Sequence, residues 1–334
     1  MGRICKTKND IRIFSHASVG GGEERNGPLG DSFDFCDGSD LFGQKSFELA
    51  ESEMGRIALN TALSKKNLSH ENIDLLIAGD LQNQCVASSV GLSGFGIPFL
   101  GVYGACSTCT ESLLLLTSFM DSAENIQLGA AVTTSHNSAA ERQFRTPLEY
   151  GGQRTPTAQW TSTAGGAFIL KRGEGGARIT EYMAGKIVDG GSADGANMGG
   201  AMAFSAAETI ISYFKESGRR PSDFDYIVTG DLGKVGSSVL RDILKRELPS
   251  AENFHTDCGL LLYDMENKDV HSGASGCGTS ASVLSAYFLP LLERGELRRI
   301  LFLSTGALMS PSSLLQGENI YGIAPLITIE SEFL

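Results

Sequence analysis

The residue best placed to do chemistry in this sequence is Cys106. It lies in residues 102–120, where a short β-branched and aromatic run ends at Gly104, small residues follow, and an apolar run of helical length begins. This order predicts a strand, a tight turn and a buried helix. A thiol at a helix start meets unpaired N–H groups and the positive end of the dipole, which lower its pKa and can hold an anion. The alternative is a small core residue, because free cysteines are among the most buried residues.

The composition of the chain excludes several classes of protein. The chain has 334 residues and a net charge of −12, and no basic stripe is visible, which argues against a nucleic acid partner. Its seven cysteines are odd in number and form no paired spacing, as in reduced intracellular thiols. We see no secretory leader and no apolar run near the roughly 18 residues that a membrane span needs. We therefore expect a soluble cytoplasmic protein without a signal peptide.

The sequence contains an internal repeat. The matched pairs are Asp74 with Asp225, Gly79 with Gly230, Asp80 with Asp231, Cys106 with Cys277, and Thr134 with Thr305. The first three pairs share one offset and the last two share another, so chance agreement is a poor explanation. Each copy reads as helix, strand, strand, helix and strand. Strands that alternate with helices predict an α/β fold whose sheets are covered on both faces.

The repeat divides the chain into three parts. Residues 1–45 are rich in Gly, Asp and Ser, and we interpret them as a long N-terminal arm without a regular element. Residues 46–200 form the first half, in which residues 47–64 carry apolar side chains at helical spacing. Residues 201–334 form the second half. We expect residues 137–200 to provide the crossover between the halves and part of any lid over a pocket.

A duplicated α/β body with a cysteine at the strand–helix turn of its first half resembles the thiolase and ketoacyl-synthase superfamily. This resemblance implies a duplicated, five-layered αβαβα fold, which is usually dimeric and has its pocket at the cysteine. Within the superfamily, the chain resembles the stage V sporulation protein AD family from about residue 27 to about residue 324. The motifs that carry this resemblance are AGDLQNQ at 78–84, GACST at 104–108, SHN at 135–137, AERQFR at 140–145, EYGGQ at 149–153, TGDL at 229–232, DCG at 257–259, SGC at 275–277 and STGA at 304–307.

The family resemblance implies a role in endospore formation. It implies binding of dipicolinic acid (pyridine-2,6-dicarboxylate), alone or as its calcium chelate, and uptake of this compound into the developing spore. The implied partners are membrane subunits of the same transport system and a second copy of the chain. The protein would then lie against the inner membrane of the forespore. In an alternative interpretation the protein binds no ligand and is a scaffold subunit that only docks on those membrane partners.

The fold itself leaves an enzyme as the alternative. Decarboxylating condensing enzymes on this fold supply a His and an Asn from the second half, but here the corresponding positions carry Gly230-Asp231 and Gly276-Cys277. An aspartate at that point opposes the negative charge that condensation must develop. A thiolase needs a second, acid–base cysteine with a His partner, and His255 and His271 lie in no recognisable motif. We therefore favour a non-catalytic binding protein over an acyltransferase or condensing enzyme with Cys106 as its nucleophile.

A small planar dianion needs N–H donors, a cation and a slot for its ring. The candidate ligand-binding residues are Asp80, Asn83, Cys106, Ser107, His136, Asn137, Arg145, Asp231 and Cys277, and we assign no catalytic residue. Arginines in a polar loop also form ordinary salt bridges, and His136 can be hydrogen-bonded without any ligand. Asp80 opposes an anion, so it is an acceptor for backbone N–H groups, a partner of His136, or a ligand for calcium.

We predict no resident metal and no cofactor. Cys106 and Cys109, with His255 and Cys258, have zinc-like spacing within each pair. The first pair lies inside the predicted buried helix, however, where closing a four-ligand site is awkward.

Overall fold

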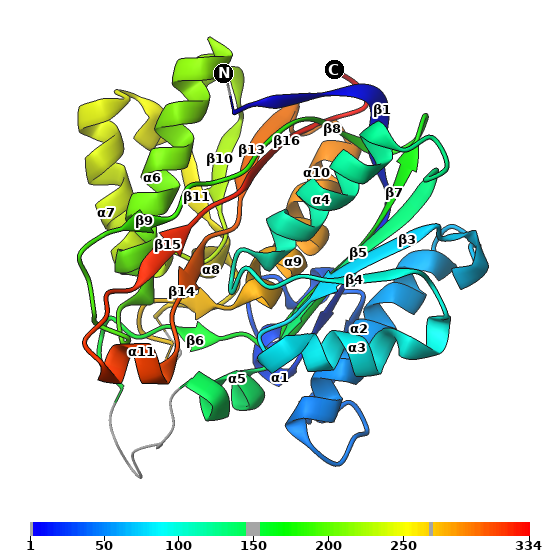
Figure 1. Ribbon diagram of the computed structural model, residues 1–334, viewed down its shortest axis with the longest axis horizontal. Coiled ribbons are helices and arrows are strands. Elements are labelled where there is room, and N and C mark those ends of the chain that lie inside the picture. Colours follow the sequence, from blue (N-terminus) through cyan, green and yellow to red (C-terminus); the bar gives the residue numbers. More distant parts are fainter. Residues whose placement is uncertain (1–2, 145–153, 267–269) are drawn as a thin grey trace.

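The computed structural model describes residues 3–144, 154–266 and 270–334, and a large mixed β-sheet runs through this part of the chain (Figure 1). Its strand order is β11-β10-β13-β16-β8-β1-β7-β5-β3-β4, with β2 paired to the end of β1. The strands are β1 (Cys5–Gly20), β2 (Phe35–Cys36), β3 (Leu75–Gly79), β4 (Phe99–Gly101), β5 (Leu128–Ser135), β7 (Ala164–Arg172), β8 (Ala177–Met183), β10 (Tyr226–Thr229), β11 (His255–Asp257), β13 (Arg299–Leu303) and β16 (Leu326–Glu330). Short strands form two small sheets, one of β6 (Trp160–Thr161) and β12 (Ala274–Ser275), the other of β9 (Val188–Asp189), β15 (Tyr321–Ile323) and β14 (Gly306–Leu308).

The large sheet consists of two halves with the same topology. Numbered along the chain, the strands of each half follow the spatial order first, fifth, fourth, second, third: β1-β7-β5-β3-β4 in one half and β8-β16-β13-β10-β11 in the other. The first strands of the two halves, β1 and β8, pair antiparallel and join them. The topology thus has the two-fold repetition that the sequence predicts. Along the chain, the first half of the sheet ends with β7 at Arg172 and the second begins with β8 at Ala177, before the expected boundary at residue 200.

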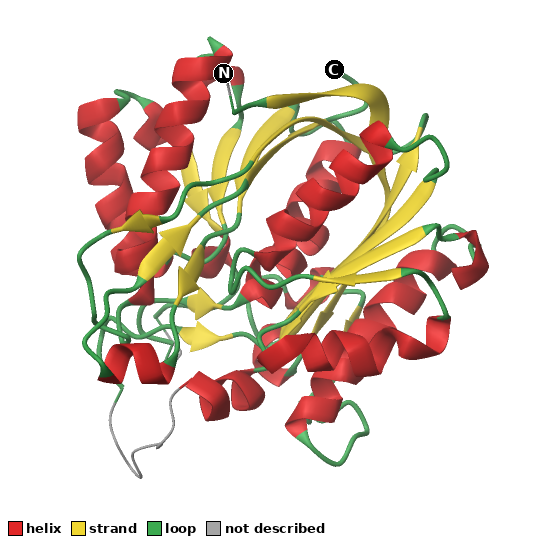
Figure 2. Ribbon diagram, viewed as in Figure 1, coloured by secondary structure: helices red, strands yellow, loops and turns green. Residues whose placement is uncertain are grey.

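Helices lie between and outside the two half-sheets, giving five layers of αβαβα type (Figures 1 and 2). On the outside of the first half-sheet lies α2 (Phe47–Ser64), with α3 (Val86–Leu92) packed against it. Between the half-sheets lie α4 (Thr108–Ser122), α9 (Cys277–Val283), a π-helix (Leu284–Phe288) and α10 (Leu289–Glu293). Outside the second half-sheet lie α6 (Met198–Ser217) and α7 (Gly233–Glu247). The remaining α-helices are α1 (Gly22–Arg25), α5 (Asn137–Phe144), α8 (Cys258–Leu261) and α11 (Pro311–Leu315).

Three apolar cores hold these layers together. Successive side chains of a strand point to opposite faces. Leu76 therefore joins the outer core under α2, while Ile77 joins the central core around α4 and α9. In the second half, Leu301 faces the outer core under α6 and Phe302 faces the central one. The strands read as nearly continuous apolar runs because both of their faces are buried.

The prediction for residues 1–45 was wrong. Residues 5–20 form the longest described strand, β1, which lies in the middle of the sheet between β7 and β8. The first half of this strand is polar and partly exposed, and in its second half Ser15, His16 and Ser18 are buried polar residues. Apolar periodicity therefore does not mark the strand. None of the described helices combines the length and apolarity that a bilayer crossing requires.

Candidate ligand pocket at Cys106

The turn before α4 is shaped by its own hydroxyl groups. Thr108 Oγ1 accepts a hydrogen bond from Gly104 N (3.1 Å) and donates one to Ala105 O (2.6 Å), and Ser107 Oγ donates to Gly104 O (2.7 Å). Ala105 has φ +51°, a left-handed conformation that is uncommon for a residue with a Cβ. These contacts set the orientation of Cys106, two residues before α4 begins. The predicted order of strand, tight turn and helix is present, but the strand ends at Gly101 and not at Gly104.

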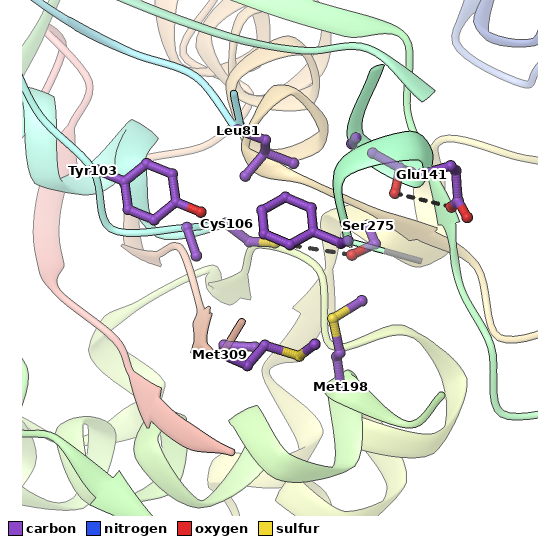
Figure 3. Close-up of a pocket in the computed structure, with 12 residues that line it drawn as sticks. Leu81, Tyr103, Cys106, Glu141, Met198, Ser275 and Met309 are labelled. Carbon is purple, nitrogen blue, oxygen red and sulfur yellow. Dashed lines mark hydrogen bonds between the residues drawn. The ribbon is translucent and has the colours of Figure 1, made fainter. Parts of the chain in front are cut away.

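A pocket that is partly open to solvent lies above Cys106. Its described lining is Leu81, Tyr103, Ala105, Cys106, Ala140, Glu141, Phe144, Thr161, Met198, Ser275, Ala307 and Met309. These residues come from both halves of the chain, and Figure 3 shows the labelled Tyr103, Met198 and Met309 around the space in front of Cys106. The lining is mainly apolar and aromatic, and Glu141 and Thr161 form one of its polar contacts (3.4 Å). Such a pocket is suited to a flat apolar body with polar groups at its edge.

A buried carboxyl group lies behind the floor of the pocket. Cys106 Sγ is 3.9 Å from Ser275 Oγ, which donates to Asp231 Oδ2 (3.2 Å). The same oxygen accepts from Gly276 N (2.9 Å), and Asp231 Oδ1 accepts from Thr305 Oγ1 (2.9 Å). Burial raises the pKa of Asp231 to about 6. The Thr305 contact has no counterpart at Asp80, so the two matched aspartates have different partners.

The thiol of Cys106 is not activated in the way the sequence suggested. Its pKa lies well above the ordinary value, first because of burial and then because of the negative charge of Asp231. Both effects disfavour the thiolate, and they outweigh any gain from the helix start. No histidine lines the described pocket. His136 Nε2 donates to Asp40 O (2.8 Å), while His255 contacts Thr229 and Arg241, so neither imidazole serves as a base for this sulfur.

Asp80 lies away from the pocket lining, fully buried at the start of the loop after β3. Its Oδ1 accepts from Gln82 N (2.8 Å), and its Oδ2 accepts from Ser88 N (2.7 Å) and Ser88 Oγ (2.6 Å). Of the three roles considered, these contacts support that of an acceptor for backbone N–H groups. Burial and the nearby Asp80 raise the pKa of Glu51. Within the residues that the structure describes, no three His, Cys, Asp or Glu side chains are grouped to hold a metal ion.

Several other predicted residues also lie outside the pocket lining. Cys277 is buried at the start of α9, and its thiol donates to Thr134 O (3.0 Å). The side chain of Asn137 donates to Thr161 O (2.9 Å), and Ser107 is used in the turn. Asn83 N donates to Gln143 Oε1 (2.9 Å) in a separate surface hollow beside α3. His136 is buried against Phe47, and burial lowers its pKa. Arg145 lies outside the described residues.

Sequence reasoning missed most of the pocket walls. Tyr103 is three residues before Cys106, and Phe144 is in the 140–145 motif, so their positions gave a signal that we did not use. Met198 is far from any motif and Met309 follows the 304–307 motif by two residues, and the tertiary fold brings both to Cys106. Burial raises the pKa of Tyr103 above its ordinary range, so this phenol keeps its proton and can donate a hydrogen bond.

Comparison with known proteins identifies the family and the fold of the chain. The family profile described as stage V sporulation protein AD matches residues 2–330. Stage V sporulation protein AD of Bacillus subtilis (strain 168) is 41% identical over 323 residues, which cover 97% of this chain and 95% of that protein.

Solved structures with the same architecture are condensing enzymes and their relatives. The 3-oxoacyl-[acyl-carrier-protein] synthase III of Aquifex aeolicus superposes with a TM-score of 0.57 at 14% identity, covering 95% of this chain and 99% of that one. A variant of OleA from Xanthomonas campestris gives a TM-score of 0.60 at 15% identity, covering 97% and 100%. At this identity the likeness concerns the fold alone, and it confirms the predicted thiolase-like class.

Proposed function

The chain belongs to the stage V sporulation protein AD family, and we propose that it is a non-catalytic, thiolase-like protein that binds dipicolinic acid or its calcium chelate. In this role it supports uptake of the compound into the developing spore, together with membrane subunits of the same transport system. The family membership and the sequence motifs support the ligand, and the pocket supports the place where it binds.

One observation carries the non-catalytic part of the proposal. Among the described residues, the polar partners of the Cys106 thiol are the Ser275 hydroxyl, the Gly276 N–H and the carboxyl group of Asp231, and burial with the charge of Asp231 outweighs the two donors. A nucleophilic cysteine needs a base or a cation that favours its thiolate, whereas a carboxylate does the opposite. The site therefore keeps the shape of a condensing pocket but lacks the groups that would activate its cysteine.

The pocket suits a flat aromatic diacid. The apolar lining, with Met198 and Met309, gives a slot for the pyridine ring. In the same lining the Tyr103 hydroxyl can donate a hydrogen bond to a carboxylate, whereas those of Thr161 and Ser275 already donate to Glu141 and Asp231. Arg145, the cation predicted for this ligand, follows α5 and lies outside the described residues.

Titration calorimetry with pyridine-2,6-dicarboxylate, with and without calcium, tests this proposal. We expect saturable binding at one site per chain. Cys106→Ala and Met198→Trp should each weaken it about tenfold, because the first alters the floor and the second fills the slot. Cys5→Ala is the matched control, since it removes an exposed thiol far from the pocket. An absence of heat with the unmodified protein, or equal weakening in the control, contradicts the proposal.

Acyl transfer at Cys106 is the second candidate, because the sulfur lines a pocket on a fold shared with condensing enzymes. It predicts an acyl adduct on Cys106 after incubation with short acyl-thioesters, detected by mass spectrometry of the intact protein and its peptides. If no adduct forms in the unmodified protein or in Asp231→Asn, in which the opposing charge is removed, this candidate is rejected.

We also propose that the protein is a homodimer. Strand β4 is the last strand at its end of the sheet, and its outer edge is unpaired within the described chain. Phe99 and Leu100 of β4, with Val86 and Val90 of the neighbouring α3, are exposed apolar residues. An open strand edge beside apolar side chains is suited to pairing with the same edge of a second copy about a two-fold axis.

A further inference from the structure

A second hollow lies on the outer face of α7, away from the Cys106 pocket. It has about 680 Å³ of space open to solvent, and its described lining is Lys234, Ser237, Ser238, Arg241, Asp242, Lys245 and Leu260. Lys234, Ser238, Arg241 and Lys245 recur every three or four residues, so they share one face of the helix. Three cations and one carboxylate give this hollow a local excess of two positive charges, in a chain whose net charge is −12. Lys245 Nζ lies 3.7 Å from Asp242 Oδ1, so the excess rests on Lys234 and Arg241.

Arg241 is held in place from behind. Its Nε donates to His255 Nδ1 (3.2 Å), and its Nη2 donates to His255 O (3.1 Å). Because a guanidinium can only donate, His255 Nδ1 is the acceptor and Nε2 carries the ring proton. That Nε2 then donates to Thr229 Oγ1 (2.8 Å), which donates to Asp257 Oδ2 (2.6 Å). Asp257 in turn accepts from the backbone N–H groups of Leu232 and Gly233, where α7 begins.

This chain of hydrogen bonds fixes the guanidinium without neutralising it. Its partners are the neutral imidazole and a carbonyl oxygen, since burial, and then the charge of Arg241, lower the pKa of His255 to about 3. Among the described residues, hydrogen bonds of Arg241 are found for Nε and Nη2 and none for Nη1, and the residue lines the hollow. An arginine that is ordered before a ligand arrives loses little entropy on binding.

Ser237 provides an independent sign of a ligand. The residue is 2% exposed, lines the hollow, and its Oγ has no hydrogen-bond partner within the described part of the chain. A buried hydroxyl without a partner costs free energy, and a bound acceptor would remove this cost. Ser237 lies three residues after Lys234 and four before Arg241, on the same side of α7.

From these contacts we infer that the hollow on α7 is a binding site for a small dianion of the phosphate type, held by Arg241, Lys234, Lys245 and the Ser237 hydroxyl. A compact oxyanion offers several acceptors to donors that converge from one side, and two negative charges match the local excess of two positive charges. The acidic net charge of the whole chain disfavours a polyanion such as nucleic acid, so a small free anion fits better. The site is separate from the Cys106 pocket and does not depend on the proposed function of that pocket.

Calorimetric titration of inorganic phosphate into the full chain at constant ionic strength tests this site. We expect saturable binding that weakens about tenfold in Lys234→Gln and in Ser237→Ala, because each loses a hydrogen bond to a charged ligand. Lys215→Gln is the matched control, since Lys215 is an exposed lysine on the neighbouring α6. Ser237→Ala removes only the unpartnered hydroxyl, so it should leave the thermal midpoint without phosphate unchanged or raised.

Two results would overturn the inference. One is an absence of saturable phosphate binding, and the other is an equal loss in Lys215→Gln, which would indicate only non-specific attraction. Parallel titration of pyridine-2,6-dicarboxylate keeps the two sites apart. If Lys234→Gln weakens phosphate binding but leaves dicarboxylate binding as it is in the unmodified protein, the hollow is assigned to phosphate. Dicarboxylate binding that is lost in Lys234→Gln and kept in Cys106→Ala would support the dianion site and contradict the function proposed for the pocket.

Discussion

The side chains of Cys106 and Asp231 come from different halves of the chain and are linked through one hydroxyl, that of Ser275. The sulfur faces the pocket and the carboxyl group lies behind it, fully buried. This arrangement places a negative charge where a catalytic cysteine would have a base or a proton donor. It makes the state of the thiol depend on that of the carboxyl group.

Neutralising Asp231 should make Cys106 more reactive. In Asp231→Asn the carboxylate charge that disfavours the thiolate is gone, so the thiol pKa should fall and alkylation by iodoacetamide at pH 8 should be about tenfold faster per unit of pKa. The rate at Cys106 is read by peptide mass spectrometry, with Cys5 in the same sample as the internal control. An unchanged rate in a folded variant would show that burial alone controls the thiol.

The matched residues Asp74 and Asp225 should make similar contributions to stability. Asp74 Oδ2 accepts from Gln127 N (2.8 Å) and Leu128 N (3.0 Å), and Asp225 Oδ2 accepts from Arg298 N (2.6 Å) and Arg299 N (2.8 Å). Each aspartate therefore fixes the start of the fourth strand of its half. Replacing either with Ala should lower the free energy of unfolding by about 1–3 kcal/mol, measured by urea denaturation. Asp242→Ala, at an exposed helix position, is the control and should have little effect.

Three buried carboxyl groups should make stability fall as the pH rises from about 4 to 7, against the smaller opposite effect of His255, whose pKa burial lowers to about 3. Burial raises the pKa of Glu24 to about 7, of Asp257 to about 7 and of Asp231 to about 6. Each group holds its proton more tightly in the folded than in the unfolded chain. Its stabilising effect is therefore fully present below the unfolded pKa and is lost as the pH passes through the folded pKa.

Thermal unfolding across this pH range measures the effect. Glu24→Gln removes one titrating carboxyl group and should flatten the dependence, whereas Glu124→Gln, at an exposed position, should leave its slope as it is. A stability that rises steadily from pH 4 to 7 in the unmodified protein would contradict the assignment of these three carboxyl groups.

Charge on the edge strand should separate the proposed dimer. Leu100→Lys adds a charge to an exposed position of β4 that is not part of the central core. We expect light scattering after gel filtration to show about twice the chain mass for the unmodified protein and a single chain for the variant. Leu315→Lys is the control, because Leu315 is an exposed apolar residue on the distant helix α11. The dimer is rejected if the unmodified protein elutes as a single chain at all concentrations.

Local patterns predicted most of the fold. The helix at residues 47–64 coincides with α2 because its apolar side chains recur at helical spacing against the sheet. The repeat predicted that Asp74 and Asp225 are equivalent and that helix, strand, strand, helix and strand follow one another in both halves, as the structure shows. Strand β1 was missed because its polar first half and buried serines hide the alternation. A central strand of this kind is recognised by its pairing with β7 and β8, which are distant in sequence.

The site was less predictable than the fold. The turn at Cys106 and its proximity to Asp231 follow from motifs in the two halves. The raised pKa of the thiol could not be predicted from these motifs. Burial and the charge of Asp231 depend on the tertiary structure, and they reverse the lowering of the pKa expected from the helix start. Asp80 and Cys277 stood in promising motifs, yet they satisfy backbone groups inside the core. Residue type and local order predict which groups are near the pocket, but not which of them face it.

The helices α4 and α9 lie between the half-sheets, where their apolar side chains share one central core with strands of both. A fragment ending after β7 would keep α4 but lose the strands that cover its second side, and a fragment beginning at β8 would expose α9 in the same way. Each would leave a large apolar surface in water. The two copies of the repeat have thus become obligate folding partners, and the chain should unfold as one cooperative unit.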